Sequence, residues 1–274
     1  MPLAPEDIRS LKMPVADLMA QACQDLVLPR FRTLSEDQIQ SKSNPNDLVT
    51  VADIEAEAWL APRLCELLPG SLALGEEAAS RGDVSAEILS QDIPVWTIDP
   101  VDGTYNFVHG SPDFCCMVGL VQDCVVQAGW ILFPTDGRLY WAGKGLGAFR
   151  QQAGQETELK IANPATKGAL SHRFFRRPAL KDRKSDVLSV LEPTVPTSCA
   201  GLNYSHAAEA RLGFVAMATL TPWDHTPGTL LVQEAGGEVW LDGGAYDPRV
   251  DQGTLIAGGH RARMQLAQDQ LLIP

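Results

Sequence analysis

One segment of the chain, residues 96–110 (WTIDPVDGTYNFVHG), combines residue types that can bind both a metal ion and a phosphate. A short apolar run predicts a buried strand that carries Asp99 at its carboxyl end. Asp102 follows three residues later, so two carboxylates can converge on one point. Gly103 permits close approach of a ligand to the backbone. Thr104 offers a hydroxyl at the expected start of a helix, where free N–H groups attract anions.

This segment has two interpretations. Carboxylates beside an anion-binding helix start suit a hard divalent cation that bridges to a phosphate. The alternative is an ordinary Asp-Pro-Gly turn with two exposed aspartates. Two other segments carry acids in comparable positions: Glu76 ends a short predicted strand, and Asp224 opens an apolar predicted helix. Taken singly, these acids would be a solvated loop residue and an ordinary helix N-cap.

Taken together, the segments resemble the inositol monophosphatase family, within the lithium-sensitive, magnesium-dependent phosphatase superfamily. The matching motifs are GEE at 75–77, DPVDGTYNFVHG at 99–110, WDHTPGTLLVQEAGG at 223–237 and, more weakly, KSNPNDLVTVAD at 42–53. They occur in the family's order and cover nearly the whole chain. The long central motif is the most specific of the four.

The resemblance implies a site for two or three Mg²⁺ ions per subunit. Glu76, Asp99 and the backbone carbonyl of Val101 would hold the first ion. Asp99, Asp102 and Asp224 would hold the second, with Asp99 bridging the two. A third, weakly held ion would lie near Glu76.

The resemblance also implies the catalytic roles. Thr104, hydrogen-bonded to Asp53 and near Glu76, would orient a metal-bound water, and the backbone amides of Gly103 and Thr104 would bind phosphate oxygens. Lys42 would belong to a flap over the metals. A metal lowers the pKa of its bound water, and a second metal stabilises the leaving oxygen. No Ser, Cys or His nucleophile is then required.

The two histidines near these motifs, His109 and His225, are accordingly predicted to be structural hydrogen-bonding residues. The chain departs from the family at one informative place. Inositol-preferring members carry a Glu seven residues before the Trp-Asp aspartate, which accepts hydrogen bonds from sugar hydroxyls. Here that position is Met217, which cannot accept such bonds strongly.

The predicted function is therefore that of a Mg²⁺-dependent phosphomonoesterase acting on a small polyol or sugar monophosphate, with inositol monophosphate as the default. The alternatives within the same chemistry are 3′-phosphoadenosine 5′-phosphate, fructose 1,6-bisphosphate and histidinol phosphate. An interaction protein built on a phosphatase scaffold is an alternative of a different class. The resemblance further implies lithium sensitivity and a homodimer.

A basic segment at 172–184 has two interpretations. The first is a solvated, charged surface loop or helix. The second is a rim that attracts a second phosphate, which would suit a bisphosphate or nucleotide substrate. On the second interpretation, replacing Arg176 and Arg177 with Ala would raise KM selectively for multiply phosphorylated substrates.

The elements around these motifs indicate an α/β (α+β) chain, and the resemblance implies the layered αβαβα sugar-phosphatase fold. We divide it into an N-terminal metal-site domain (1–150) and a C-terminal domain (151–274) that completes the substrate site. The glycine-rich stretch 143–147 is interpreted as a connection between strands rather than a dinucleotide loop. Hydrophobic periodicity predicts helices at 14–32, 54–68, 205–212, 224–235 and 261–271, and strands at 71–74, 95–98, 116–121, 125–132, 138–141, 239–241 and 255–257.

Composition limits the partners and the compartment. The chain has 274 residues and a formal net charge of −12, which disfavours nucleic acid as a main partner. It has neither a signal-like start nor an apolar run long enough to span a membrane. The six cysteines show no CxxC pair and are expected to be scattered, reduced core thiols. We therefore expect a cytoplasmic protein whose partner is a small phosphorylated substrate.

Overall fold

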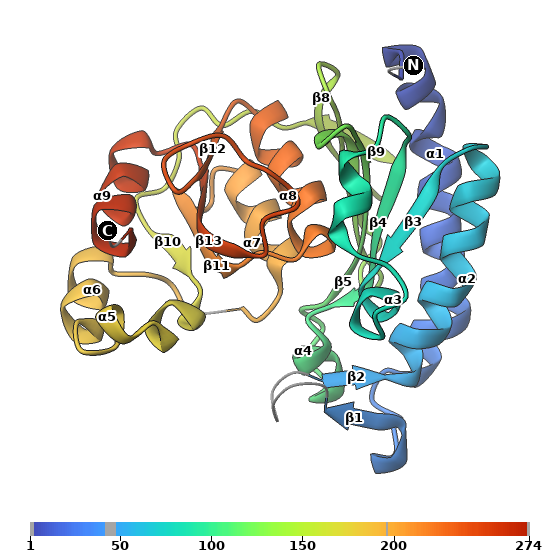
Figure 1. Ribbon diagram of the computed structural model, residues 1–274, viewed down its shortest axis with the longest axis horizontal. Coiled ribbons are helices and arrows are strands. Elements are labelled where there is room, and N and C mark those ends of the chain that lie inside the picture. The colour runs from blue at the N-terminus through green and yellow to red at the C-terminus, as the bar shows by residue number, and fades with distance from the viewer. Residues whose placement is uncertain (1–2, 42–47, 196, 273–274) are drawn as a thin grey trace.

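The elements stack as helix, sheet, helix, sheet and helix layers, which confirms the predicted αβαβα architecture (Figure 1). This computed structural model describes residues 3–41, 48–195 and 197–272. Half of the weak motif 42–53, including Lys42, therefore lies outside the described residues. The helices are α1 (Pro5–Ala22), α2 (Val51–Leu67), α3 (Glu76–Ser80), α4 (Thr104–Val108), α5 (Pro178–Lys181), α6 (Lys184–Leu191), α7 (Ala200–Ala208), α8 (Pro222–Glu234) and α9 (Arg261–Leu271).

The strands form a large sheet, a smaller one and a two-stranded ribbon. The large sheet has the order β3-β4-β5-β6-β7-β8-β9, the smaller β10-β11-β13-β12, and β1 pairs with β2. The strands are β1 (Ile39–Ser41), β2 (Leu48–Thr50), β3 (Leu72–Gly75), β4 (Val95–Asp102), β5 (Cys115–Gln122), β6 (Val125–Phe133), β7 (Arg138–Gly143), β8 (Gly147–Gln152), β9 (Gln155–Glu158), β10 (Gly168–Leu170), β11 (Phe214–Thr219), β12 (Glu238–Leu241) and β13 (Gln252–Gly258).

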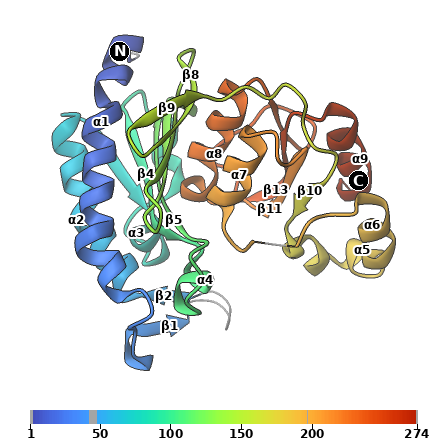
Figure 2. The ribbon, with the colours of Figure 1, turned by 180° about the vertical axis from the view of Figure 1, so that it is seen from behind.

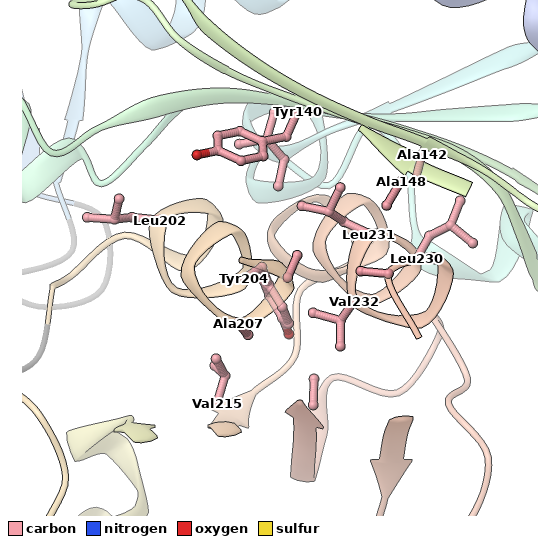
Figure 3. Close-up of a cluster of buried hydrophobic side chains, with 14 of the residues drawn as sticks. Tyr140, Ala142, Ala148, Leu202, Tyr204, Ala207, Val215, Leu230, Leu231 and Val232 are labelled. Atoms are coloured by element: carbon pink, nitrogen blue, oxygen red, sulfur yellow. The ribbon is translucent and has the colours of Figure 1, made fainter. Parts of the chain in front are cut away.

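Helices α1 and α2 cover one face of the large sheet, and α7 and α8 lie between the two sheets (Figure 2). Helices α7 and α8 contribute side chains to the core between the sheets, where they pack against both sheets. Tyr140 reaches down from the large sheet, Leu231 and Tyr204 project from the helices, and Val215 rises from the smaller sheet (Figure 3). Helices α6 and α9 cover the outer face of the smaller sheet.

A row of small side chains on β4, β5 and β6 lets α8 approach the large sheet closely. Thr97, Gly119 and Gly129 are directly paired neighbours in this row. A Cβ atom on Gly129 would lie 2.6 Å from the Cα of Pro227, and one on Gly119 would lie 2.4 Å from the Thr226 hydroxyl oxygen. Glycine is therefore required at both positions by the backbone and side chains of α8.

Two of the predicted helices are wrong in their bounds. The 14–32 prediction corresponds to α1, which begins nine residues earlier because Pro5 at its first turn starts the helix and Ile8 continues the buried stripe. A π-helical turn and a 3₁₀ turn containing Pro29 follow it. The 205–212 prediction corresponds to α7, which ends at Ala208 because Ala210 has a left-handed backbone (φ 60°).

Six strands, β1, β2 and β8 to β11, were not predicted. β9 is exposed along its whole length and β8 is mostly half-buried, so neither shows the alternation of apolar residues that marks a strand. Strand β4 is longer than predicted, because a register shift between Asp99 and Asp102 accommodates Pro100 and the chain does not turn there. The interpretation of 143–147 as a strand connection is confirmed, since it joins β7 to β8.

The two-domain division stays a prediction. The large sheet extends to Glu158 and the smaller one begins at Gly168, so the predicted boundary at 150 falls within β8. In the ranges described, no helix combines the length and the apolar character needed to cross a lipid bilayer.

Gly129→Ala tests the close approach of α8 to the large sheet. The new methyl group has no room against Pro227, so the variant is expected to lose about 1–3 kcal/mol of unfolding free energy, measured by chemical denaturation. Gly244→Ala is the matched control, because a Cβ atom there makes only an ordinary contact with the Leu241 carbonyl. Equal stabilities of the two variants would contradict the proposed packing constraint.

Candidate functional site

Three carboxyl groups from three separate elements meet at one end of the large sheet. Glu76 is the first residue of α3 directly after β3, Asp99 lies on β4, and Asp224 lies in the first turn of α8. Each offers an oxygen within 4.8 Å of the oxygens of the other two. Strands β3 and β4 are parallel neighbours, so their carboxyl ends lie at the same edge. The predicted convergence of Glu76, Asp99 and Asp224 is thus seen in the geometry.

A hydrogen bond fixes the position of α8 relative to β4. The hydroxyls of Thr97 and Thr226 are 2.7 Å apart and both side chains are fully buried. Thr97 precedes Asp99 by two residues and so shares its face of β4. Thr226 follows Asp224 by two residues in α8. This contact holds the first turn of α8, and with it Asp224, beside Asp99.

Asp102 is buried next to this group, but its oxygens face another set of partners. They accept hydrogen bonds from the N–H groups of Ala200 (3.1 Å) and Gly201 (2.6 Å) in the first turn of α7. The thiols of Cys199 (3.1 Å) and Cys115 (3.5 Å) contact the same carboxylate. Asp102 therefore links the metal-binding motif to the N-terminus of α7.

The two thiols beside Asp102 correct the expectation that the cysteines are scattered. The sulfur atoms of Cys115 and Cys199 are 3.8 Å apart. Cys199 directly precedes α7, and Cys115 is the first residue of β5 and lies opposite Asp102 in the sheet. The fold therefore brings the two thiols together, which sequence spacing does not reveal. All six cysteines are free thiols, as expected.

Asp53 and Thr104 are connected as predicted. Asp53 is the third residue of α2 and accepts hydrogen bonds from the backbone N–H (2.9 Å) and hydroxyl (2.6 Å) of Thr50, which completes a capping box. The Thr104 hydroxyl lies 3.2 Å from the second Asp53 oxygen and 3.0 Å from the Val101 carbonyl oxygen. One hydroxyl proton serves these two acceptors, and the hydroxyl lone pairs remain available to a water.

Gly103 begins α4 with a left-handed backbone (φ 90°). A Cβ atom there would lie 3.0 Å from the Asp113 carbonyl oxygen, so both the conformation and the space require glycine. Gly103 and Thr104 line the same pocket as Glu76 and Asp99. This placement agrees with the expected role of their amides in binding phosphate.

Glu57 on α2 was missed by the sequence analysis. It is buried, and its carboxylate accepts the backbone N–H groups of Glu77 (2.7 Å) and Ala78 (2.9 Å), which caps α3. A Cβ atom on Gly75 would lie 2.2 Å from the Glu57 carboxyl carbon. Glu57 therefore positions the turn that carries Glu76. Its spacing of four residues from Asp53 on one helix face is the signal that could have identified it.

Burial and mutual repulsion raise the pKa values of these acids. Burial raises the pKa of Asp99 well above its usual range, and the charges of Glu76 and Asp224 add to this effect. Burial also raises the pKa of Asp224 to about 6, an effect strengthened by Asp102 and opposed by Arg173. The pKa of Asp53 is likewise raised by burial to about 6, against the hydrogen bonds from Thr50.

The histidines have hydrogen-bonding surroundings that agree with a structural role. His225 is buried, with its Nδ1 2.8 Å from the Tyr204 hydroxyl and its Nε2 2.8 Å from the Thr219 carbonyl oxygen. Burial lowers its pKa to about 4, so it is neutral at pH 7. His109 is exposed; its Nδ1 lies 2.7 Å from the Tyr105 carbonyl oxygen and its ring stacks on that tyrosine.

A pocket of about 630 Å³ contains the acid cluster and extends toward the smaller sheet. Met217, the residue at the inositol-contacting position of relatives, is half-buried and lines it. From the basic segment, His172, Arg173 and Arg176 line the same pocket. Lys181, Arg183 and Lys184 are exposed outside the pocket, as the solvated-surface interpretation predicts.

The prediction that Arg177 acts with Arg176 is wrong. The Arg177 guanidinium donates hydrogen bonds to the Gly253 carbonyl and the Thr254 hydroxyl of β13, and it lies 4.9 Å from the Phe174 ring centre. Consecutive residues in this turn point in different directions, so the two arginines serve different purposes. Arg177 anchors the turn, and Arg176 faces the pocket.

The carboxylates form a donor set that fits a hard divalent cation. Three anionic oxygens lie close enough to share one ion; Asp99 is buried, and Glu76 and Asp224 are half-buried. Buried like charges at such distances repel strongly without a compensating cation. The ligand set and the environment therefore suit a metal such as Mg²⁺.

The raised pKa of Asp224 predicts how the metal-free protein responds to pH. The pKa of Asp224 is about 6 in the folded chain, against an ordinary value of 3.8. Between pH 3.8 and about 6, the folded state therefore binds more protons at this carboxyl group than the unfolded state does. The unfolding free energy of the chelator-treated protein thus loses a contribution as pH rises from about 4 to about 6. Asp224→Asn should stabilise that protein at pH 7 by about 1–3 kcal/mol, and this gain should shrink toward pH 4.5.

The measurement is chemical denaturation in the presence of a chelator at both pH values. Asp186→Asn on the exposed face of α6 is the control for removal of a carboxylate charge outside the cluster. A gain from Asp224→Asn that is the same at both pH values would contradict the assigned shift. Excess Mg²⁺ should abolish the gain, because the cation stabilises the ionised carboxylates of the wild type.

The comparisons with known proteins agree with this geometry. A sequence profile of the inositol monophosphatase family matches residues 12–271. The inositol-1-monophosphatase of Bacillus subtilis (strain 168) is 31% identical over 243 residues, 85% of this chain and 87% of the relative. A Thermotoga maritima protein named fructose-1,6-bisphosphatase/inositol-1-monophosphatase is 27% identical over 209 residues, 74% of this chain and 75% of the relative.

The fold is shared with solved structures. The crystal structure of inositol monophosphatase II from Staphylococcus aureus MSSA476 superposes with a TM-score of 0.75 at 24% identity, covering 96% of this chain and 95% of that one. The profile match extends over almost the entire chain, and the identity to the Bacillus subtilis relative supports it independently. This chain therefore belongs to the inositol monophosphatase family.

Proposed function

We propose that this chain is a Mg²⁺-dependent phosphomonoesterase that hydrolyses a small polyol or sugar phosphate. The convergence of Glu76, Asp99 and Asp224 in one pocket is the observation that supports it best. With the Val101 carbonyl and Asp102, these residues would hold the metal ions. When bound, the metal ions supply Lewis-acid stabilisation of phosphate charge and lower the pKa of a coordinated water.

The chain's own residues orient the reactants. Gly103 and Thr104 line the pocket, and their amides would bind phosphate oxygens. The Thr104 hydroxyl, held between Asp53 and the Val101 carbonyl, would accept a hydrogen bond from the attacking water and fix its direction. Among the described residues that line the pocket, the only histidines are His172 and His225, and the second has both ring nitrogens within hydrogen-bond distance of protein groups.

The substrate proposal has inositol monophosphate as its default, in line with the names of the relatives. The name of the Thermotoga maritima relative favours fructose 1,6-bisphosphate as an alternative. The substrates to be assayed also include 3′-phosphoadenosine 5′-phosphate and histidinol phosphate, and together these four compounds form the substrate panel. Lithium inhibition, a homodimer and a cytoplasmic location belong to the same proposal and are testable by inhibition kinetics, sedimentation and cell fractionation.

Asp99→Asn tests the whole assignment. Removal of the central carboxylate charge should reduce Mg²⁺-dependent phosphate release by roughly two to three orders of magnitude. Asp186→Asn, an exposed acid on α6, should retain wild-type turnover. Full Mg²⁺-dependent activity in Asp99→Asn would overturn the site assignment. Wild-type protein that releases no phosphate from any member of the panel would favour the interaction-protein alternative instead.

Thr104 variants test the orienting role. Thr104→Val is nearly isosteric but has no hydroxyl, so kcat should fall by roughly 10²-fold while Mg²⁺ affinity changes little. Thr104→Ser keeps the hydroxyl and should restore most of the activity. A Thr104→Ser variant as inactive as Thr104→Val would indicate that the methyl packing, rather than the hydroxyl, matters.

A further inference from the structure

Two arginines that line the pocket, Arg173 and Arg176, donate no side-chain hydrogen bond to another residue in the ranges that the structure describes. In the described part of the chain, every arginine side chain except Arg9, Arg173 and Arg176 donates a hydrogen bond to a protein acceptor. Arg9 lies on the exposed face of α1 and needs no further explanation, since surface arginines are solvated. Arg173 and Arg176 line the pocket that holds the acid cluster.

The turn that carries these arginines is anchored on both sides. It is a 3₁₀ turn, His172–Arg176, whose start is capped by the Ser171 hydroxyl, which accepts the Arg173 N–H (3.3 Å). Phe174 is fully buried and Phe175 nearly so, under the smaller sheet. The next residue, Arg177, is bonded to β13 as described above. Two guanidinium groups thus extend from a fixed base, which limits the entropy lost when they bind a ligand.

The charges in the pocket are arranged by sign. The acids Glu76, Asp99 and Asp224 come from the large sheet and α8, whereas the cations come from a single turn that follows β10 of the smaller sheet. The field of Arg173 reaches Asp224, whose pKa it lowers against burial. The carboxylates nevertheless form no salt bridge with either arginine among the described residues. The guanidinium groups are left available to an anion that enters the pocket.

A guanidinium group presents paired donors that match phosphate and carboxylate oxygens. The neighbouring wall offers Met217, which has no strong acceptor for a sugar hydroxyl. A volume of about 630 Å³ accommodates a ligand larger than a single phosphate. The pocket therefore has donors that can recognise a second anionic group.

We propose that Arg173 and Arg176, with His172 beside them, form a second anion subsite, so that the preferred substrate carries another anionic group besides the phosphate that is hydrolysed. This inference rests on the proposed phosphomonoesterase function and specifies its substrate class. Both phosphate and carboxylate have the required chemistry, and the substrates chosen for the test distinguish them.

The test compares matched substrates that differ in the second anion. Fructose 1-phosphate is compared with fructose 1,6-bisphosphate, and glycerol 3-phosphate with 3-phosphoglycerate, by steady-state phosphate release with Mg²⁺. The wild type should show the higher kcat/KM for the member with the second anion. Preference in the first pair alone identifies a phosphate subsite, and preference in the second pair alone identifies a carboxylate subsite.

Arg173→Ala and Arg176→Ala should each reduce the ratio of kcat/KM between the doubly anionic and singly anionic substrates by about 10-fold or more, because a charge-assisted hydrogen bond is lost. The loss should lie mainly in KM. Arg176→Lys should recover part of the ratio, since it keeps the charge without the paired donors. Arg9→Ala and Lys181→Ala, which remove exposed cations outside the pocket, should leave the ratio unchanged.

Two failures are distinguishable in this design. If the wild type hydrolyses none of the substrates with Mg²⁺, the proposed function itself fails. If it hydrolyses them but the ratio is the same in the wild type, Arg173→Ala and Arg176→Ala, the proposed function stands and the second subsite is overturned. The second subsite would also be overturned if Arg9→Ala reduced the ratio of kcat/KM between doubly and singly anionic substrates as much as Arg176→Ala does. Net charge alone would then explain the effect.

Discussion

The close approach of α8 to the large sheet is the constraint on which the site depends. Electrostatic repulsion between the Asp224 and Asp99 carboxylates would separate the two residues in the absence of a restraint. The Thr97–Thr226 hydrogen bond prevents this, and it forms only because Gly119 leaves no side chain between β5 and the helix. The packing of the central helix layer thus overcomes an electrostatic penalty that the site alone would not sustain.

The surrounding acids differ in how their charge is compensated. Asp102 has two N–H donors from the first turn of α7, and Asp53 has the capping interactions of Thr50. Asp99 accepts the Val101 N–H, but burial and the charges of Glu76 and Asp224 raise its pKa well above the usual range. Asp99 lies at the centre of the cluster, where a cation shared by three carboxylates has the greatest effect. Metal binding and folding are coupled at this residue through its protonation.

The sequence predicted what depends on local spacing. The acids of the three motifs follow from short patterns that each occupy one element, whereas the order of the layers and the link from Asp53 to Thr104 were expected from the resemblance to the family. Other features depend on contacts between distant elements. Asp102 faces α7, Glu57 supports the turn of Glu76, and Arg176 and Arg177 diverge because β13 holds only the second. Hydrophobic periodicity contains no information on such tertiary contacts. β8 and β9 lack even that pattern, because β8 is mostly half-buried and β9 is exposed.

The net charge of −12 would by itself repel a doubly anionic substrate. Two Mg²⁺ ions would change the formal charge only from −12 to −8, so the overall sign stays the same. Over distances beyond about 10 Å, however, salt screens most of that repulsion, and binding is governed by the local field of the pocket. There the acids would be neutralised by metal, whereas Arg173 and Arg176 form no salt bridge or side-chain hydrogen bond with the other described residues. An acidic protein can therefore present a cationic pocket, and the second anion of a substrate would add to affinity rather than reduce it.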